Sequence, residues 1–401
     1  MKLILTIIVI SQFFCTSIWF ASNAIMPDII QKLHLNASFL GHLTSAVQFG
    51  FILGTLVFAV FTIADRFSPS LIFFISALIA ALFNLAISIE GIHAPGLLCF
   101  RFFTGFFLAG IYPIGMKIAS DYYQQGLGKS LGFLVGALVL GTAFPHLLKS
   151  MAADFPWKYV IYSTSALSVL GGVTMLIFVP DGPNRKPGQK LKLNSFLLAF
   201  KNPEFQSAAL GYFGHMWELY AFWAFVPVML TTYKNLYPGT NLNVPFFSFL
   251  IIALGGVACV FSGLLSQKFR PKKIAIISLF LSGLCCMFSP LFLLNSSAFL
   301  LLLFLFSWGL VVIADSPLFS TLIAQSAPEE TRGTSLTIVN CIGFSITIIS
   351  IQLINALSSK ISAQFIYMLL AIGPLVGLIA LLKNKDNHPP HKLIATERGR
   401  Y

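Results

Sequence analysis

The sequence is poor in charge. Only 9% of its 401 residues are Asp, Glu, Lys or Arg, while 57% are hydrophobic. A soluble domain of this length could not keep so apolar a surface in water. The composition therefore excludes a soluble protein and indicates a chain that lies largely in a membrane.

The sequence also lacks the motifs of enzyme active sites. It contains no His-x-x-x-x-Asp, no phosphate-binding glycine loop and no quartet of metal ligands. Its six cysteines all fall inside apolar runs, where they act as small hydrophobic side chains, and no pair is available for a disulfide. We therefore expect neither an enzyme nor a bound cofactor or metal, and the absence of a sensor domain argues against a receptor.

What fills the chain is a series of twelve apolar runs, each near the length of about 20 residues that spans a bilayer as a helix. The runs are Leu3–Ile25, Phe39–Phe61, Leu71–Ile89, Gly96–Ile118, Leu131–Leu148, Tyr159–Val179, Phe205–Leu230, Phe246–Leu265, Ile274–Leu294, Phe299–Ile323, Ser335–Leu357 and Ile361–Leu382. They are continuously apolar rather than alternating, which favours helices over barrel strands. The fold class expected is an all-α membrane protein with twelve transmembrane helices.

The first run also resembles a secretory signal peptide, because Lys2 precedes it and the small residues Ala21-Ser22-Asn23-Ala24 end it. Cleavage there would leave eleven spans. We expect a retained helix, because twelve spans divide into two matching sets.

Basic residues predict the orientation. If the N-terminus is cytoplasmic, the inner segments hold nineteen of the 25 Lys and Arg residues and the outer segments five, with Arg101 inside a span. Cytoplasmic segments carry such an excess. Both termini are therefore expected in the cytoplasm, and the net charge of +12 requires no nucleic-acid partner. We expect a monomer in the inner membrane of a bacterium.

The twelve runs divide into two halves. The expected units are an N-terminal six-helix bundle at 1–180, a cytoplasmic linker at 181–204, a C-terminal six-helix bundle at 205–383 and a cytoplasmic tail at 384–401. Short matches recur between the halves, such as Arg66-Phe67-Ser68-Pro69 with Lys268-Phe269-Arg270-Pro271, and Pro113 with Pro317. Their nearly constant offset indicates a duplication.

This layout and three motifs resemble the major facilitator superfamily of secondary transporters. That family carries Gly-x-Leu-Ala-Asp-Arg-x-Gly-Arg-Arg between its second and third helices. The chain keeps Ala64-Asp65-Arg66 there but lacks both glycines and the trailing arginines. Arg101 and Gly105 match the family's Arg-x-x-x-Gly in the fourth helix, and Gly132, Gly136, Gly141 and Pro145 loosely match its fifth helix. The resemblance implies two pseudo-symmetric bundles that rock around a site between them.

Few charges fall within the runs, and such groups are functional candidates because they are costly in lipid. Glu218 lies near the middle of the seventh run, where loss of hydration favours the protonated carboxyl, and His215 lies on the same helix face. The pair could carry protons; a neutral Glu218 that ties helices together is the alternative. No second ligand pair accompanies His215 and Glu218, so the sequence does not favour a metal site.

Arg101 and Asp315 are the other candidates at depth. Arg101 shares a helical stripe with Tyr112, and the resemblance implies a cavity-facing arginine on a proton or substrate pathway; an arginine that reaches the outer interface is the alternative. Asp315 precedes Pro317, so it could mark a gating hinge or simply a structural bend. Lys117, at a helix end, is interpreted as an interfacial anchor. Gly132, Gly136, Gly373 and Gly377 predict close helix contacts.

The resemblance implies further site residues. Helices one, four, seven and ten line the family's cavity, which makes Trp19 and Asn23 of the first run candidates for the substrate pathway. Asp65 and Arg66 correspond to the family's cytoplasmic gate. Asp65 would face the positive N-terminal end of a helix near Gly333 in the other half, and Arg66 would pair with Asp121.

The function expected is a secondary active transporter that moves a small solute by alternating access, with protons as the coupling ion. Arg101 favours uptake of a small organic anion or metabolite, whereas the aromatic content of 14% favours efflux of a hydrophobic drug-like molecule. These two alternatives remain open at this point.

Overall fold

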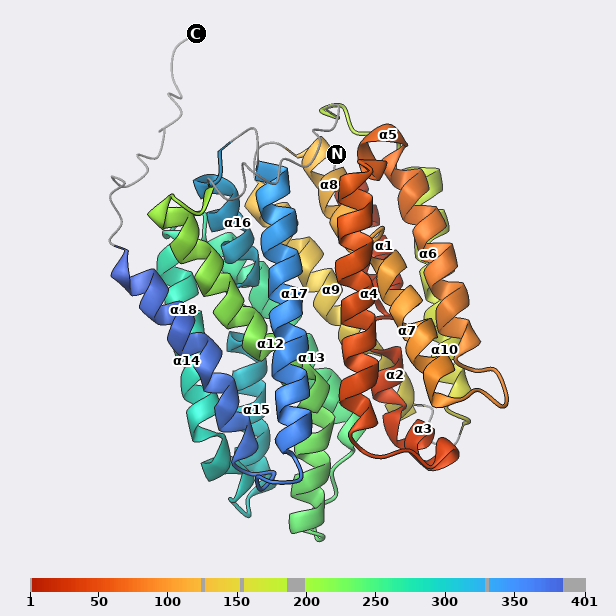
Figure 1. Cartoon of the computed structure of the whole chain (residues 1–401), viewed down its shortest axis with the longest axis vertical. Helices are drawn as coiled ribbons and strands as arrows, with labels where there is room; N and C mark the ends of the chain where they lie inside the picture. The colour runs from red at the N-terminus through yellow and green to blue at the C-terminus, as the bar shows by residue number, and fades with distance from the viewer. Residues whose placement is uncertain (1, 124–126, 152–154, 186–198, 329–331, 385–401) are drawn as a thin grey trace.

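The computed structural model describes residues 2–123, 127–151, 155–185, 199–328 and 332–384. Within these ranges the chain is a bundle of roughly parallel helices without strands (Figure 1). The first helix begins and the last ends at the same end of the bundle, here called the terminal end; the other is called the opposite end. Many large apolar side chains are exposed on the outer surface, as lipid contact requires.

The helices of the first half run to Phe178. They are α1 (Lys2–Thr16), α2 (Ala21–Ala24), α3 (Met26–Leu33), α4 (Phe39–Val60), α5 (Ile63–Arg66), α6 (Pro69–Ala86), α7 (Ala94–Leu108), α8 (Tyr112–Tyr122), α9 (Leu127–Met151) and α10 (Lys158–Phe178). Those of the second half are α12 (Pro203–Leu236), α13 (Val244–Leu265), α14 (Pro271–Leu293), α15 (Ala298–Val311), α16 (Ser316–Ser326), α17 (Arg332–Leu357), the 3₁₀ segment η2 (Ile366–Ala371) and α18 (Ile372–Lys383).

The helices match the predicted spans closely. Ten segments of the described chain are long and apolar enough to cross a membrane. The remaining two predicted spans correspond to α1 with α2, which a break shortens, and to the 34-residue α12. The all-α membrane fold is confirmed, and the helices are consistent with twelve spans. Most of the predicted linker (186–198) and tail (385–401) lies outside the described residues.

Three of the spans are broken. The first is interrupted at 17–20, the fourth at 109–111 and the tenth at 312–315. Pro113 and Pro317 each occupy the second position of the helix that follows a break. Proline lacks an N–H and disfavours a helical residue before it, but fits the first turn of a new helix. The matching prolines therefore produce matching breaks.

The packing repeats between the halves. α1 packs against α9 and α10, just as α12 packs against α17 and α18; α4 packs against α7 as α13 does against α15. A Cβ added to Gly105 would lie 1.9 Å from the Val47 carbonyl oxygen, and one added to Gly309 would lie 2.2 Å from that of Ile251. Only glycine allows these backbones to approach so closely. The equivalent positions of the two contacts support the predicted duplication.

The halves meet chiefly through two helix pairs, α9 with α13 and α4 with α17. Toward the opposite end, Gln352 Nε2 donates hydrogen bonds to Gly41 O (3.1 Å) and Ser45 Oγ (2.7 Å), and Asn355 Nδ2 donates to Ser38 O (2.9 Å). We call these contacts the α4–α17 seal.

The predicted glycine contacts form as well. A Cβ on Gly136 would lie 3.0 Å from Gly256 O, and one on Gly132 would lie 3.1 Å from Cys259 O, both across the α9–α13 pair. Gly373 and Gly377 pack in the same way against Gly214 and Gly211 of α12. The prediction of close helix contacts at these four glycines is confirmed.

The seal predicts a specific cross-link. In a protein with Ser45→Cys and Gln352→Cys, a short thiol cross-linker should join α4 to α17, because the native side chains lie within hydrogen-bond distance. After cleavage at a protease site placed between the halves, the linked fragments should migrate as one band on a denaturing gel. Each single substitution is the control, and two separate fragments from the double variant would contradict the seal.

Candidate functional site: the central cavity

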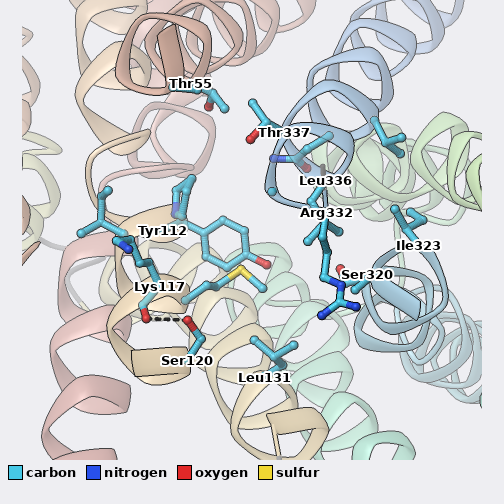
Figure 2. A pocket seen from close by; sticks show the side chains of 18 of the residues that line it. Thr55, Tyr112, Lys117, Ser120, Leu131, Ser320, Ile323, Arg332, Leu336 and Thr337 are labelled. Atoms are coloured by element: carbon cyan, nitrogen blue, oxygen red, sulfur yellow. Dashed lines mark hydrogen bonds between the residues drawn. The ribbon is translucent and has the colours of Figure 1, made fainter. Parts of the chain in front are cut away.

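A cavity of about 1010 Å³ lies between the two halves. Its wall includes Thr55 of α4, Tyr112 of α8, Tyr212 and Tyr220 of α12, and Phe344 of α17. In Figure 2 the Tyr112 ring projects from α8 toward Ser320 of α16 and Arg332 of α17. The exposed Arg332 and Gly333 belong to the wall, so the cavity opens at the terminal end. The seal closes the opposite end.

The deep part of the cavity carries no charge in the described chain. Its polar groups are tyrosines and amides, and the Tyr212 hydroxyl donates a 2.7 Å hydrogen bond to Asn340 Oδ1. The charged lining side chains lie near the mouth, on α5, α8 and the start of α17; they are Asp65, Lys117, Asp121 and Arg332. A charged solute would therefore find counter-charges at the entrance but none deep in the wall.

The mouth differs from the predicted gate. Lys117 Nζ lies 2.8 Å from Asp65 Oδ1 and 3.9 Å from Asp121 Oδ2. Arg66 Nε instead donates to Thr62 Oγ1 (3.2 Å). The expected pair of Arg66 with Asp121 is absent, because Lys117 lies one helical turn before Asp121 on α8 and reaches both acids.

Asp65 also faces its own half in this conformation, with Gly333 on the other wall of the open mouth. Arg185 holds the loop after α5 by donating to the carbonyl oxygens of Asp65 (3.1 Å) and Phe67 (2.6 Å) while pairing with Asp181. The sequence reasoning overlooked Lys117 and Arg185 as gate residues. The spacing of four residues in Lys117–Asp121 and Asp181–Arg185 was the available signal.

Arg101 does not line the cavity. Its side chain is fully buried, and Nη1 donates to Ile18 O (3.0 Å) and Asn84 Oδ1 (3.5 Å) while Nη2 donates to Trp19 O. Ile18 and Trp19 lie in the break of the first span, where carbonyl groups lose their helical partners. Arg101 thus stabilises the break instead of reaching the outer interface or the open cavity.

Trp19 and Asn23 are also buried behind the wall. Trp19 is 0% exposed and Asn23 4% exposed, and neither lines the open cavity. Tyr112 is the one candidate of the predicted substrate pathway that faces the cavity directly.

Glu218 lies inside the second half, buried among neutral hydrogen-bond donors. Its carboxylate accepts from Trp308 Nε1 (2.6 Å), Ser282 Oγ (2.9 Å) and Cys286 Sγ (3.2 Å). These partners come from α15 and α14, so the carboxylate joins three helices. No basic side chain among the described residues pairs with it.

His215 and Asp315 form a second buried contact in the same half. His215 Nδ1 lies 2.8 Å from Asp315 Oδ1, and each side chain is 1% exposed. Asp315 precedes α16 at the break of the tenth span, as the proline predicted. The neighbouring residues Met216, Leu219, Ile313 and Ser316 line the cavity. The three titratable groups therefore lie one layer behind the cavity wall.

In the described part of the chain, no three His, Cys, Asp or Glu side chains converge to hold a metal ion.

Comparison with known proteins identifies the family. The model of the Major Facilitator Superfamily matches residues 8–351. The chain belongs to this family. It is an integral membrane transporter and not an enzyme. No curated protein sequence gives a significant match.

Two solved structures share the fold. One is a bacterial homologue of the human lysosomal transporter Spinster in an inward-facing, unoccupied conformation, with a TM-score of 0.69, 15% identity and 95% of each chain covered. The other is the proton:xylose symporter XylE bound to 6-bromo-6-deoxy-D-glucose, with a TM-score of 0.75 and 14% identity, covering 95% of this chain and 94% of that one. The transporter's fold is thus confirmed by structures of distant sequence.

Arg101→Lys should destabilise the transporter. A lysine cannot donate to both carbonyls and to Asn84 from one fixed plane, and a hydrogen bond to a charged group contributes about 1.5–3 kcal/mol. We expect a lower free energy of unfolding and a clearly lower melting temperature, followed by tryptophan fluorescence in detergent. Arg66→Lys, an exposed arginine with one side-chain partner, is the matched control. Equal melting of both variants would refute the role of Arg101 in the break.

Proposed function

We propose that the protein is a proton-coupled secondary transporter that moves a small solute through the central cavity by alternating access. The single observation that carries this proposal is the environment of Glu218. This acid is buried in the second half, and its carboxylate accepts hydrogen bonds only from neutral donors. Such a site tolerates either protonation state, because the carboxylate accepts three hydrogen bonds and the protonated acid needs no counter-ion. A carboxylate locked to a basic partner would resist protonation.

His215 and Asp315 provide a physical connection between this acid and the solute. Both Glu218 and His215 lie on α12, and Asp315 lies at the break that separates α15 from α16. Ile313 and Ser316, on either side of Asp315, face the cavity. A change of charge at Glu218 or at the His215–Asp315 contact would therefore act on the two helices that a bound solute touches.

The conformational cycle follows from the two ends of the cavity. In the state described, the mouth is open and the α4–α17 seal is closed. In the alternate state the seal would part, and the mouth would close as Asp65 approaches the N-terminal end of α17, where free backbone N–H groups favour a carboxylate. Lys117 would lose its partner Asp65 in that step and retain Asp121, one turn away on α8.

The cavity favours one of the two substrate classes left open by the sequence. Arg101 was the reason to expect an anion, and its guanidinium is bound to backbone carbonyls rather than exposed in the cavity. The deep wall combines aromatic rings with hydroxyl and amide groups. We infer an uncharged or amphipathic solute over a small organic anion.

Glu218→Gln should remove the proton dependence of transport. Glutamine keeps the shape and hydrogen-bonding capacity of the protonated acid but cannot release a proton. In proteoliposomes with an imposed pH gradient, we expect gradient-driven accumulation or efflux to fall to the background rate, while solute exchange without a gradient persists. Glu90→Gln is the matched control, because Glu90 is an exposed acid paired with Lys158. Full coupling in Glu218→Gln would rule out this acid as the proton site.

We further propose that the terminal end faces the cytoplasm of a bacterium. The basic residues Arg66, Lys117 and Arg185 all lie at this end, as the positive-inside rule requires. A reporter that is active only in the cytoplasm should work when fused after residue 401 or before residue 1. A reporter that is active only in the periplasm should work when it is placed in the loop that joins α12 to α13, at 237–243. The opposite pattern of activities would reverse the orientation.

A further inference from the structure

A stripe of side chains runs along one face of α4 between the seal and the cavity. Thr44, Gln48, Phe51 and Thr55 follow one another at spacings of four, three and four, so they share a helix face. Thr44 lies next to the seal residue Ser45, and Thr55 lines the cavity. Gln48 therefore occupies the layer between the closed seal and the cavity floor.

The segment that faces this stripe is the broken part of the first span. Asn23 Nδ2 donates a 2.9 Å hydrogen bond to Thr44 Oγ1, and the Trp19 ring lies 4.9 Å from that of Phe51. Gln48 is four residues after Thr44 and three before Phe51, so it lies between these two contacts. Trp19, Asn23 and Gln48 thus form one buried cluster.

The cluster holds polar atoms that the protein does not satisfy. Gln48 is fully buried, and neither Oε1 nor Nε2 has a hydrogen-bond partner among the described residues. The same holds for Asn23 Oδ1 and Trp19 Nε1. Burying such groups unpaired opposes folding. Two donors and two acceptors are thus gathered on facing elements, where a bound molecule could pair with all of them.

Aromatic rings from both halves cover this cluster on the cavity side. Trp19 stacks on Tyr220 and Phe344 at centroid distances of 6.0 and 5.9 Å, and Phe51 lies 4.6 Å from Phe344. Tyr220 and Phe344 line the cavity floor. Because these rings meet across the interface between the halves, parting of the halves at the opposite end would separate both the rings and the seal, and would expose Gln48.

We propose that Trp19, Asn23 and Gln48 form a substrate subsite for an uncharged, polyhydroxylated or amide-bearing solute in the conformation open to the opposite end. The inference rests on the proposed transport function and names the solute class. A primary amide offers a donor and an acceptor together, which matches a hydroxyl or amide of the solute. The indole adds a donor and an apolar face against which a ring can stack.

Charge on the solute is not required by this subsite. Arg101 is the basic side chain bound to the same segment, and both of its terminal nitrogens already donate to the carbonyls of Ile18 and Trp19 and to Asn84. A buried anion would need a free partner to offset its lost hydration. The test therefore compares neutral compounds with charged derivatives of the same skeleton.

The experiment is a thermal-shift screen on the purified full-length protein, followed by affinity measurements. The probes are pairs such as glucose with glucuronate and uridine with uridine monophosphate, together with a hydrophobic cation. We expect stabilisation by at least one neutral probe and less or none by its charged partner. For that probe, Gln48→Met should weaken binding about tenfold or more. Methionine keeps the length and flexibility of the side chain but removes the amide.

Gln12→Met is the matched control. Gln12 is equally buried and its amide also lacks partners among the described residues, but it lies against Gly115 of α8, away from the cluster. We expect its affinity for the probe to stay within about twofold of the unmodified protein. The subsite would be overturned if Gln48→Met bound the neutral probe as tightly as the unmodified protein does. It would also be overturned if the unmodified protein preferred the charged probes, or if no neutral probe shifted its melting temperature.

A second variant covers the case in which Gln48→Met does not fold. Gln48→Cys should react with a small thiol reagent faster than the buried native cysteines Cys15, Cys259 and Cys286 do, because the opposite-facing state exposes it. The bound probe should slow that reaction several-fold. Unchanged labelling would overturn the proposal. If the unmodified protein binds the neutral probe but a proton gradient does not drive its transport, proton coupling is wrong and the subsite stands. If Gln48→Met still carries out gradient-driven transport of a charged solute, the subsite is wrong and proton coupling stands.

Discussion

Inside a lipid bilayer each backbone N–H and C=O group needs a partner within the protein, and this chain interrupts three of its spans. Each interruption must be stabilised by something other than the helix itself. At the first span the stabilising group is Arg101, which reaches across from α7 and donates to two carbonyls at 18 and 19. The buried cluster around Trp19 lies at this break, so the geometry of that cluster depends on one guanidinium.

The two halves use the same plan for different purposes. Both break their fourth or tenth helix before a proline, and both bring glycines against a neighbouring carbonyl. In the first half the buried Arg101 has a structural role, because its guanidinium donates hydrogen bonds to backbone oxygens. The second half keeps α12 continuous, with His215 and Glu218 on that helix and Asp315 in contact with His215. The two halves thus share a plan of helices but differ in the groups at depth: in the first, Arg101 binds the backbone, and in the second, Glu218, His215 and Asp315 lie close together.

The ends of the cavity differ in their chemistry. The seal at the opposite end consists of neutral amide and hydroxyl contacts, supported by aromatic stacking between the halves. The open mouth consists of charged groups, with Lys117 between Asp65 and Asp121. Neutral contacts separate with little dependence on salt, whereas exposed ion pairs are screened. The charged groups therefore lie at the mouth, where water enters, and the uncharged groups lie at the seal, where the cavity is closed.

The sequence by itself determined the membrane class, the positions of the helices, the bend before Pro317 and the likeness of the two halves, because apolar length, proline and glycine act through local geometry. It also singled out Glu218, His215, Asp315 and Arg101 as the ionisable groups at depth, because the free-energy cost of placing such a group in the bilayer follows from its position along a span. It did not determine which side of a helix each group faces. Only the tertiary structure decided that Arg101 binds the backbone at 18 and 19, that Lys117 takes the place of Arg66, and that Gln48 lies unpaired beneath aromatic rings. These outcomes depend on which helices become neighbours, and the rotation of each helix about its axis is set by packing between spans distant in the chain.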